Sequence, residues 1–254
     1  IGWRFVNPKM KVEFGIDSMP ETAENVAEKY QINREDQDKM ALESQIKAIK
    51  AISSGRMSKE ITPVEILQRK GPSIMFDKDE HPRETSIEKL SSLSSPFRKN
   101  GTVTAATSSP LTDGAATTLI CEEQYAKDNN LEILARIVST AVEGCDPDFM
   151  GLGPIGASRK ALKRANISIK DIDIIELNEA FASQSLACIK DLEIDLKKVN
   201  LDGGAISLGH PLGATGARIT GKAAELLVRE NKKYALVTQC IGYGMGIATV
   251  IESL

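Results

Sequence analysis

The sequence predicts an α/β fold, and three observations support that prediction. Candidate strands and helices alternate along residues 131–254, which is the order expected when helices pack on a sheet. Aromatic residues make up only 4% of the chain while glycine and alanine are plentiful, which favours close packing of helices on strands over a β-sandwich. Residues 1–100 carry many charges of both signs and look like a separate, helix-rich layer.

Helical spacing dominates the first part of the chain. Residues 1–20 are expected to form a loop with a short helix. Apolar residues recur at helical spacing over Glu21–Tyr30, which predicts a helix there. Asn33 is a good N-cap for a second helix, which is expected to continue to about Ser53 and to end at Gly55.

Residues 61–100 look short and turn-rich. A strand with an edge proline is expected at Ile61–Ile66, and one or two helical turns are expected at Ile87–Leu93. The charged stretch 68–84 between them contains His81, which we expect to be an exposed loop histidine.

The residue pattern of the sequence changes at Gly101. Residues 102–105 look strand-like, and Asp113 ends a turn that is followed by an apolar helix or strand at 115–121. The later elements are predicted as a buried strand at 131–142, a helix at 152–165, a strand at 171–177, a helix at 179–192, a loop and helix at 203–230, and strands at 234–240 and 247–252.

Composition excludes several classes of partner. The chain has 32 basic and 35 acidic residues, and this net charge of -3 argues against nucleic acid as the main partner. No run is long and apolar enough to cross a membrane. The four cysteines have no metal-ligand spacing, so we expect free thiols in a reducing, cytoplasmic compartment and no bound metal or cofactor.

His210 lies in the most unusual stretch of the chain, Gly203–Arg218, which holds five glycines and one proline. Glycines let the backbone approach another group closely or adopt positive φ. A neutral imidazole on such a loop could accept a proton from a nucleophile or donate to a developing oxyanion. The alternative is a glycine-rich turn that carries a surface histidine.

Two further candidates stand where strands are expected to end. Asn178 would place an amide against a water or a carbonyl oxygen, or it would simply cap the following helix. Cys240 precedes the glycine-rich segment 242–246, which suits thiolate chemistry and backbone N–H donors, although a buried cysteine beside a tight hairpin has the same pattern. Together the three sites suggest acyl chemistry without specifying a nucleophile.

These motifs, in this order and spacing, closely resemble the thiolase family. The matching segments are Met19–Ala27, Gly101–Ala105, Asp113–Ala116, Gly151–Pro154, Asn178–Ala182, Gly203–Arg218 and Cys240–Gly246. The resemblance covers the whole chain and implies the layered αβαβα thiolase fold, with two similar α/β halves and an inserted lid. It would make residues 1–100 the lid or loop domain, 101–130 the end of the N-terminal half and 131–254 the C-terminal domain.

The resemblance also implies an activity. Thiolases cleave a 3-ketoacyl-CoA with CoA or run the reverse Claisen condensation, with CoA as substrate and no metal. By motif, His210 would activate the nucleophilic thiol and share an oxyanion hole with a water held by Asn178. Cys240 would move the α-proton as a thiolate of near-neutral pKa, and the backbone N–H of Gly242 would join a second oxyanion hole.

Substrate contacts and assembly follow from the same resemblance. Arg83 and Ser109 fall where the family contacts the nucleotide and pantetheine parts of CoA, and Met19 and Phe181 fall near the acyl pocket. Thiolases are usually homodimers or homotetramers. The chain is similar at Ile1–Phe5 and Asp17–Glu21 to 3-oxoadipyl-CoA thiolases of aromatic degradation. It is similar at Thr107–Ser109 and Gly144–Pro147 to enzymes of fatty-acid β-oxidation, so the acyl chain length stays open.

One departure from the family matters more than the matches. The nucleophilic cysteine of thiolases lies upstream of the lid, and none of Cys121, Cys145 and Cys188 has its context. The sequence also starts at Ile1 without a methionine, so we expect an incomplete, poorly soluble chain that has no thiolysis activity alone. The alternatives are a ketosynthase-like enzyme, which needs a histidine where Cys240 stands, and a non-catalytic, thiolase-like lipid-carrier or scaffold protein.

Overall fold

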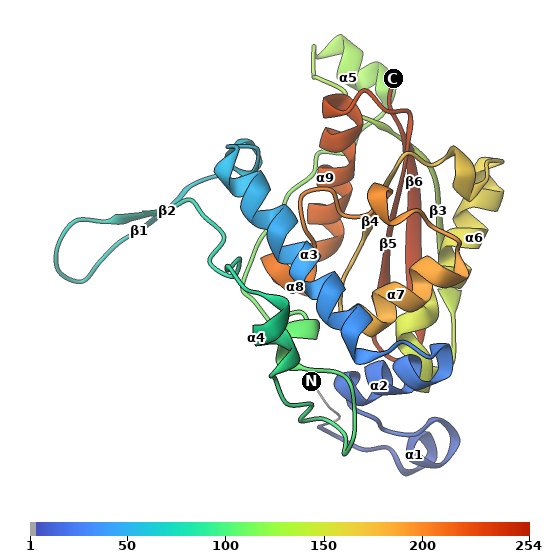
Figure 1. Ribbon diagram of the computed structural model, residues 1–254. Helices are drawn as coiled ribbons and strands as arrows, with labels where there is room; N and C mark the ends of the chain where they lie inside the picture. Colours follow the sequence, from blue (N-terminus) through green and yellow to red (C-terminus); the bar gives the residue numbers. More distant parts are fainter. Residues whose placement is uncertain (1–3) are drawn as a thin grey trace.

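A four-stranded mixed sheet forms the centre of the molecule in the computed structural model, which describes residues 4–254 (Figure 1). The strands lie in the order β3 (Arg136–Gly144), β6 (Met245–Glu252), β5 (Tyr234–Ile241) and β4 (Ile174–Leu177). The first three are antiparallel neighbours, whereas β4 runs parallel to β5. Ile1–Trp3, where the sequence begins without a methionine, lie outside the described residues.

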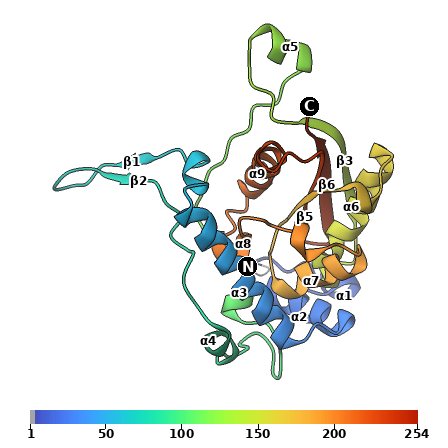
Figure 2. The same cartoon turned by 45° about the horizontal axis from the view of Figure 1, so that its top comes forward.

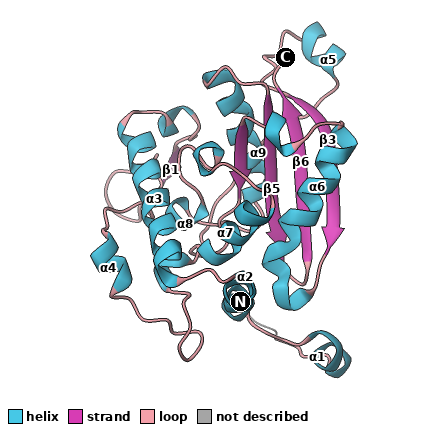
Figure 3. Cartoon of the chain, turned by 45° about the vertical axis from the view of Figure 1, so that its right-hand side comes forward, coloured by secondary structure: helices cyan, strands magenta, loops and turns pink. Residues whose placement is uncertain are grey.

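Helices cover both faces of this sheet (Figure 3). Helices α6 (Gly153–Ala165) and α7 (Ala182–Asp191) pack on one face, and α9 (Thr215–Arg229) packs on the other. Successive side chains of a strand point to opposite faces, so Ile174 packs with α9 while Ile175 packs with α6 and α7. The predicted α/β fold is therefore confirmed.

Four helices precede the sheet in the chain. They are α1 (Pro8–Phe14), α2 (Met19–Tyr30), α3 (Arg34–Ser53) and α4 (Ile87–Ser91); α2 and α3 contact α7 directly, and α4 packs on α3. The predicted cap of α3 is present, because the side chain of Asn33 accepts a hydrogen bond from the backbone N–H of Asp36. A hairpin of β1 (Val64–Ile66) and β2 (Ile74–Phe76) projects from the body (Figures 1 and 2).

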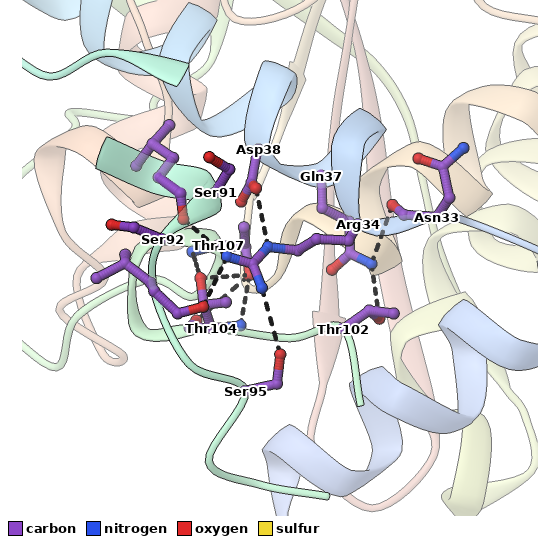
Figure 4. Close-up of polar contacts among 12 residues, drawn as sticks. Asn33, Arg34, Gln37, Asp38, Ser91, Ser92, Ser95, Thr102, Thr104 and Thr107 are labelled. Atoms are coloured by element: carbon purple, nitrogen blue, oxygen red, sulfur yellow. Dashed lines mark hydrogen bonds and ion pairs between the residues drawn. The ribbon is translucent and has the colours of Figure 1, made fainter. Parts of the chain in front are cut away.

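Helix α3 also fixes the connection that leads to the site (Figure 4). The Arg34 guanidinium pairs with Asp38 at 2.8 Å and donates to the carbonyls of Leu90 and Leu93 at 2.7 and 2.9 Å. One turn further, the Gln37 amide donates to the hydroxyl of Thr102 at 2.9 Å. The chain after α4 is thus held against α3 before it enters the site.

The remaining elements are short. They are the helices α5 (Glu123–Asp128) and α8 (Ala205–Leu208) and 3₁₀ turns at Met57–Lys59, Ala105–Thr107, Pro147–Leu152, Ile169–Asp171 and Leu196–Lys198. No helix within residues 4–254 is both long and apolar enough to span a bilayer. The predicted domain boundaries at residues 100 and 130 stay a prediction.

Three sequence predictions are wrong. Residues 102–105 form no strand, and the apolar stretch 115–121 has no regular structure and is exposed, because no neighbouring strand among residues 4–254 pairs with it. The buried strand expected at 131–142 begins only at Arg136 and is half exposed. Its edge position explains the exposure, since α6 covers one face of β3 and α9 packs instead on β4 and β5.

Candidate active site

His210 is held at the end of α8 by backbone geometry. Gly209 has a φ of 95°, and a β-carbon there would lie 2.5 Å from Cγ2 of Thr112, so this position needs glycine. The backbone N–H of His210 donates to the Pro110 carbonyl at 3.1 Å. The glycine-rich loop therefore carries a half-buried imidazole on a fixed backbone, not a freely exposed surface histidine.

The hydrogen bonds of His210 define its tautomer. Its Nδ1 lies 2.7 Å from Oγ1 of Thr215, and that hydroxyl donates its only proton to the Pro211 carbonyl at 3.1 Å. Thr215 must then accept, so we assign the ring proton to Nδ1. The Nε2 lone pair faces the Asn178 amide nitrogen at 3.3 Å.

Burial also keeps the His210 ring neutral. Desolvation, with the nearby Arg218 cation as a second cause, lowers the pKa of His210 to about 4. At neutral pH the ring is thus an uncharged base whose lone pair lies at Nε2, where it accepts from the Asn178 amide.

Asn178 follows β4 directly and is buried. Its backbone N–H donates to the Thr238 carbonyl at 3.0 Å, which extends the pairing of β4 with β5. The alternative of a helix cap is wrong, because α7 begins only at Ala182 with Phe181 as its N-cap residue. The Asn178 Oδ1 atom has no hydrogen-bond partner among the described residues. The side chain is therefore placed for the imidazole and for a further polar group rather than for the helix.

Cys240 lies near the end of β5, opposite Gly246 on β6. Its side chain packs with Met19 against the apolar cluster that contains Phe181. Burial raises the pKa of Cys240 to about 12, so the resting group is a thiol. The expectation of a thiolate with near-neutral pKa is therefore wrong for the resting chain, because the apolar neighbours from α2 and the Phe181 segment remove water from the sulfur.

The turn after Cys240 brings several backbones together. Tyr243 and Gly244 have φ values of 73° and 94°, so the chain reverses over three residues. Gly242 is the first residue of this turn, and a β-carbon placed on it would lie 4.0 Å from Sδ of Met19. A β-carbon at Gly246 would overlap the backbone of Gly153 at the start of α6. Glycine is thus required where α6 supports the turn.

Three of the four predicted substrate contacts lie beside these groups. Ser109 donates through both its N–H and its hydroxyl to the Ala180 carbonyl, at 3.0 and 3.1 Å, and Met19 and Phe181 pack with Cys240. Arg83 is exposed in the loop after β2, and its backbone N–H donates to Oε1 of Gln45 on α3 at 2.9 Å. His81, expected to be exposed, is half-buried.

Sequence reasoning missed Thr215 and Glu179. The only signal for Thr215 is a hydroxyl residue five positions after the histidine, where α9 begins. Glu179 is 3% exposed and accepts hydrogen bonds from three separate segments. No local pattern reveals those partners, because they are far from it along the chain.

The thiols of Cys145, which is half-buried, and Cys188, which is buried, are not activated. The thiol of Cys145 lies 3.8 Å from the Met150 carbonyl and that of Cys188 lies 3.4 Å from the Gly151 carbonyl, and burial raises the pKa of both. Cys121 is exposed in the irregular segment. Three carboxylates, Glu60, Asp202 and Glu225, lie close enough together to hold a metal ion. Three cations already pair with them: Lys222 with Glu60 and Asp202, Arg229 with Asp202 and Glu225, and Arg56 with Asp202.

Comparison with known proteins agrees with this arrangement. The family described as "Thiolase, C-terminal domain" matches residues 131–253, and "Thiolase, N-terminal domain" matches residues 9–124. The chain belongs to the thiolase family.

Individual relatives narrow the comparison. The chain is 52% identical over 255 aligned residues to the 3-oxoadipyl-CoA/3-oxo-5,6-dehydrosuberyl-CoA thiolase of Escherichia coli, which covers 99% of the chain and 64% of the relative. It is 49% identical to an acetyl-CoA acetyltransferase of Pseudomonas aeruginosa, over 91% of the chain and 59% of that protein. The chain thus spans slightly under two thirds of the relatives that it matches.

Solved structures share the fold. The Bacillus anthracis acetyl-CoA acetyltransferase superposes with a TM-score of 0.92 at 46% identity, over 94% of this chain and 61% of that one. Human mitochondrial 3-ketoacyl-CoA thiolase superposes with a TM-score of 0.86 at 44% identity, over 92% and 59%.

Proposed function

We propose that this chain carries the proton-transfer side of an acetyl-CoA C-acyltransferase, a thiolase that cleaves a 3-ketoacyl-CoA with CoA or runs the reverse Claisen condensation. The observation that carries the proposal is the His210 ring, neutral and proton-bearing at Nδ1, with its Nε2 lone pair beside Asn178. The thiol of Cys240 supplies an acid on the neighbouring strand.

The resting protonation states suit the cleavage direction. The Asn178 amide leaves the Nε2 lone pair of His210, and Nε2 takes the proton of a nucleophilic thiol. The resulting thiolate attacks the keto carbon, and the carbon–carbon bond breaks to leave a thioester enolate. Cys240 donates its proton to the enolate carbon. The thiol of CoA then gives its proton to the Cys240 thiolate, and the CoA sulfur takes the acyl group from the nucleophilic cysteine. His210 returns its Nε2 proton to the thiolate that is released.

The charge that develops on oxygen needs fixed donors. Asn178, through its amide or a water held by it, and His210, once protonated at Nε2, would bind one oxyanion, and the Gly242 backbone N–H would bind the other. Every step is an acyl or proton transfer, so we propose that no cofactor or metal is required and that CoA acts only as a substrate.

The acyl-accepting cysteine is not among the candidates that this chain offers, since Cys145 and Cys188 are held by carbonyls and have raised pKa values. We therefore propose that the nucleophilic thiol comes from the part of the relatives that this chain does not span, and that the 254-residue chain alone does not catalyse thiolysis. A homodimer or homotetramer and a cytoplasmic location stay predictions.

For the substrate, we favour 3-oxoadipyl-CoA or a similar short, polar 3-ketoacyl-CoA. The support is the 52% identity to a thiolase named for that compound, against 49% over a shorter stretch for an acetyl-CoA acetyltransferase. Tyr243 stands at the turn after Cys240 and would narrow the acyl pocket. Arg83, Ser109, Met19 and Phe181 are the proposed contacts to CoA and the acyl group.

An assay of a completed chain tests this function. The 254 residues would be joined to the part of the Escherichia coli relative that they leave uncovered, and cleavage of 3-oxoadipyl-CoA and acetoacetyl-CoA by CoA would be measured. His210→Asn and Cys240→Ala should each lower kcat by about a hundredfold or more, because general acid–base groups contribute roughly 10²–10⁴. His81→Asn and Cys121→Ala are the matched controls and should keep the rate.

Three outcomes would contradict the proposal. They are thiolysis by the 254-residue chain alone, full activity in His210→Asn or Cys240→Ala, and a folded, completed chain that is inactive on both substrates. The last outcome would favour the non-catalytic lipid-carrier or scaffold reading.

A further inference from the structure

Glu179 is a buried carboxylate next to the candidate site. It directly follows Asn178 in the chain and is 3% exposed. One of its oxygens, Oε2, accepts from the Ser44 hydroxyl at 2.7 Å and from the Ile206 backbone N–H at 3.2 Å, and the other accepts from the Asn200 amide at 2.7 Å. One buried carboxylate thus joins α3, α8 and the loop after Val199.

Each of these partners is itself fixed. Asn200 pairs with both the N–H and the carbonyl of Leu177, at 3.0 and 2.9 Å, which locks it to the end of β4. Ser44 accepts from the Gly204 N–H at 3.1 Å. A β-carbon at Gly204 would overlap the Glu179 carboxylate, so the glycine lets the carboxylate lie against this backbone. The carboxylate is therefore anchored from several directions.

Both members of the Asn178–His210 contact depend on this anchor. Asn178 is the residue next to Glu179, and His210 follows the short helix α8, whose second residue, Ile206, donates to Glu179. The amide and Nε2 lie 3.3 Å apart, and the Glu179 carboxylate bonds the segments that carry them rather than the two groups themselves. On α3, Ser44 neighbours Gln45, which holds the Arg83 loop.

We propose that Glu179 is a positioning residue, which holds Asn178 against Nε2 of His210 and so maintains the tautomer that the base requires, with Ser44 of α3 as its second support. The consequence for the rate rests on the proposed function. The geometric part does not, because the tautomer of His210 can be measured without substrate.

The test is ¹⁵N NMR of the two histidines in the 254-residue chain and its variants. Three groups donate to Glu179, namely the Ser44 hydroxyl, the Asn200 amide and the Ile206 N–H. In Glu179→Gln an NH₂ group replaces one of the two carboxylate oxygens, so at least one of these donors loses its acceptor. We expect the ratio of the two neutral tautomers of His210 to change roughly fivefold or more, since one hydrogen bond is worth about 1 kcal/mol. Ser44→Ala should shift the ratio in the same direction by less.

Glu24→Gln is the matched control. Glu24 is also 3% exposed and accepts from the backbone N–H groups of Thr102 and Val103, both at 2.9 Å, but it has no bond to the site. We expect this control to lose stability while the His210 signals stay unchanged.

Two results would overturn the inference. One is an unchanged His210 tautomer in Glu179→Gln, or in Ser44→Ala where Glu179→Gln does not fold. The other is an equal shift in Glu24→Gln, which would mean general loosening. An inactive completed chain with a normal response of His210 would contradict the proposed function and leave this inference intact.

Discussion

Removal of the Thr215 hydroxyl should disturb both the stability of the chain and the base. In Thr215→Val the side chain keeps its shape, but the Nδ1–H of His210 loses its acceptor at 2.7 Å. The Pro211 carbonyl loses the hydroxyl at 3.1 Å but keeps the backbone N–H groups of Ala214 and Thr215 at 2.8 and 2.9 Å. A buried polar group left without a partner costs about 1–3 kcal/mol. Because the His210 ring is the one group left without a partner and is half-buried, we expect a loss of about 1–2 kcal/mol.

The same substitution should move the ring proton. Without the Thr215 hydroxyl, the tautomer with the ring proton on Nε2 becomes the more favourable one. After the Asn178 amide rotates, its unpartnered Oδ1 can accept a hydrogen bond from that Nε2–H. The base then lacks its lone pair, and we expect kcat of the completed enzyme to fall about a hundredfold.

Urea unfolding and histidine ¹⁵N shifts measure the two effects. Thr220→Val is the matched control, because Thr220 lies on the same helix and its hydroxyl bonds only the Gly216 carbonyl at 2.7 Å. We expect the control to cost no more than about 1 kcal/mol and to leave the tautomer unchanged. Equal costs for the two variants, or an unchanged tautomer in Thr215→Val, would refute the reasoning.

Three further predictions follow from buried groups. Burial raises the pKa of Glu176 to about 8, above its value in the unfolded chain, so ionisation of this carboxyl destabilises the folded chain as the pH rises from about 5 to 8. In urea titrations the free energy of unfolding of Glu176→Gln should equal that of the wild type near pH 5 and exceed it by about 3 kcal/mol at pH 8. Asp202→Asn leaves the buried ammonium of Lys222 with Glu60 as its remaining carboxylate partner and should cost about 2–3 kcal/mol by the same method; a variant as stable as the wild type would contradict this. Gly246→Ala should cost about 2–3 kcal/mol by forcing α6 from the turn, whereas Gly213→Ala, with open space around it, should melt like the wild type.

Elements with a strong local pattern could be predicted from the sequence. The helix expected at 152–165 is present as α6, and the strands expected at 234–240 and 247–252 are β5 and β6 with shifts of one or two residues. In each, the period of the apolar residues matches the face that is buried. The His210 loop was also visible, because closely spaced glycines and a histidine are rare in a simple connection.

The features that the sequence did not predict depend on groups far apart in the chain. The exposure of β3 follows from its edge position, which its own residues do not encode. The resting state of Cys240 is set by Met19 and Phe181, which are distant in sequence. The His210 tautomer depends on whether Thr215 donates to Pro211, a choice that only the fold makes.

The titration of His210 tests the central claim most directly. In the 254-residue chain with His81→Asn, a single histidine remains to be followed by ¹⁵N NMR from pH 3 to 8. We expect a proton on Nδ1, a lone pair on Nε2 that accepts from the Asn178 amide at neutral pH, and a pKa near 4. A ring protonated at Nε2 at neutral pH, or a pKa at or above the ordinary value of 6.5, would contradict the account.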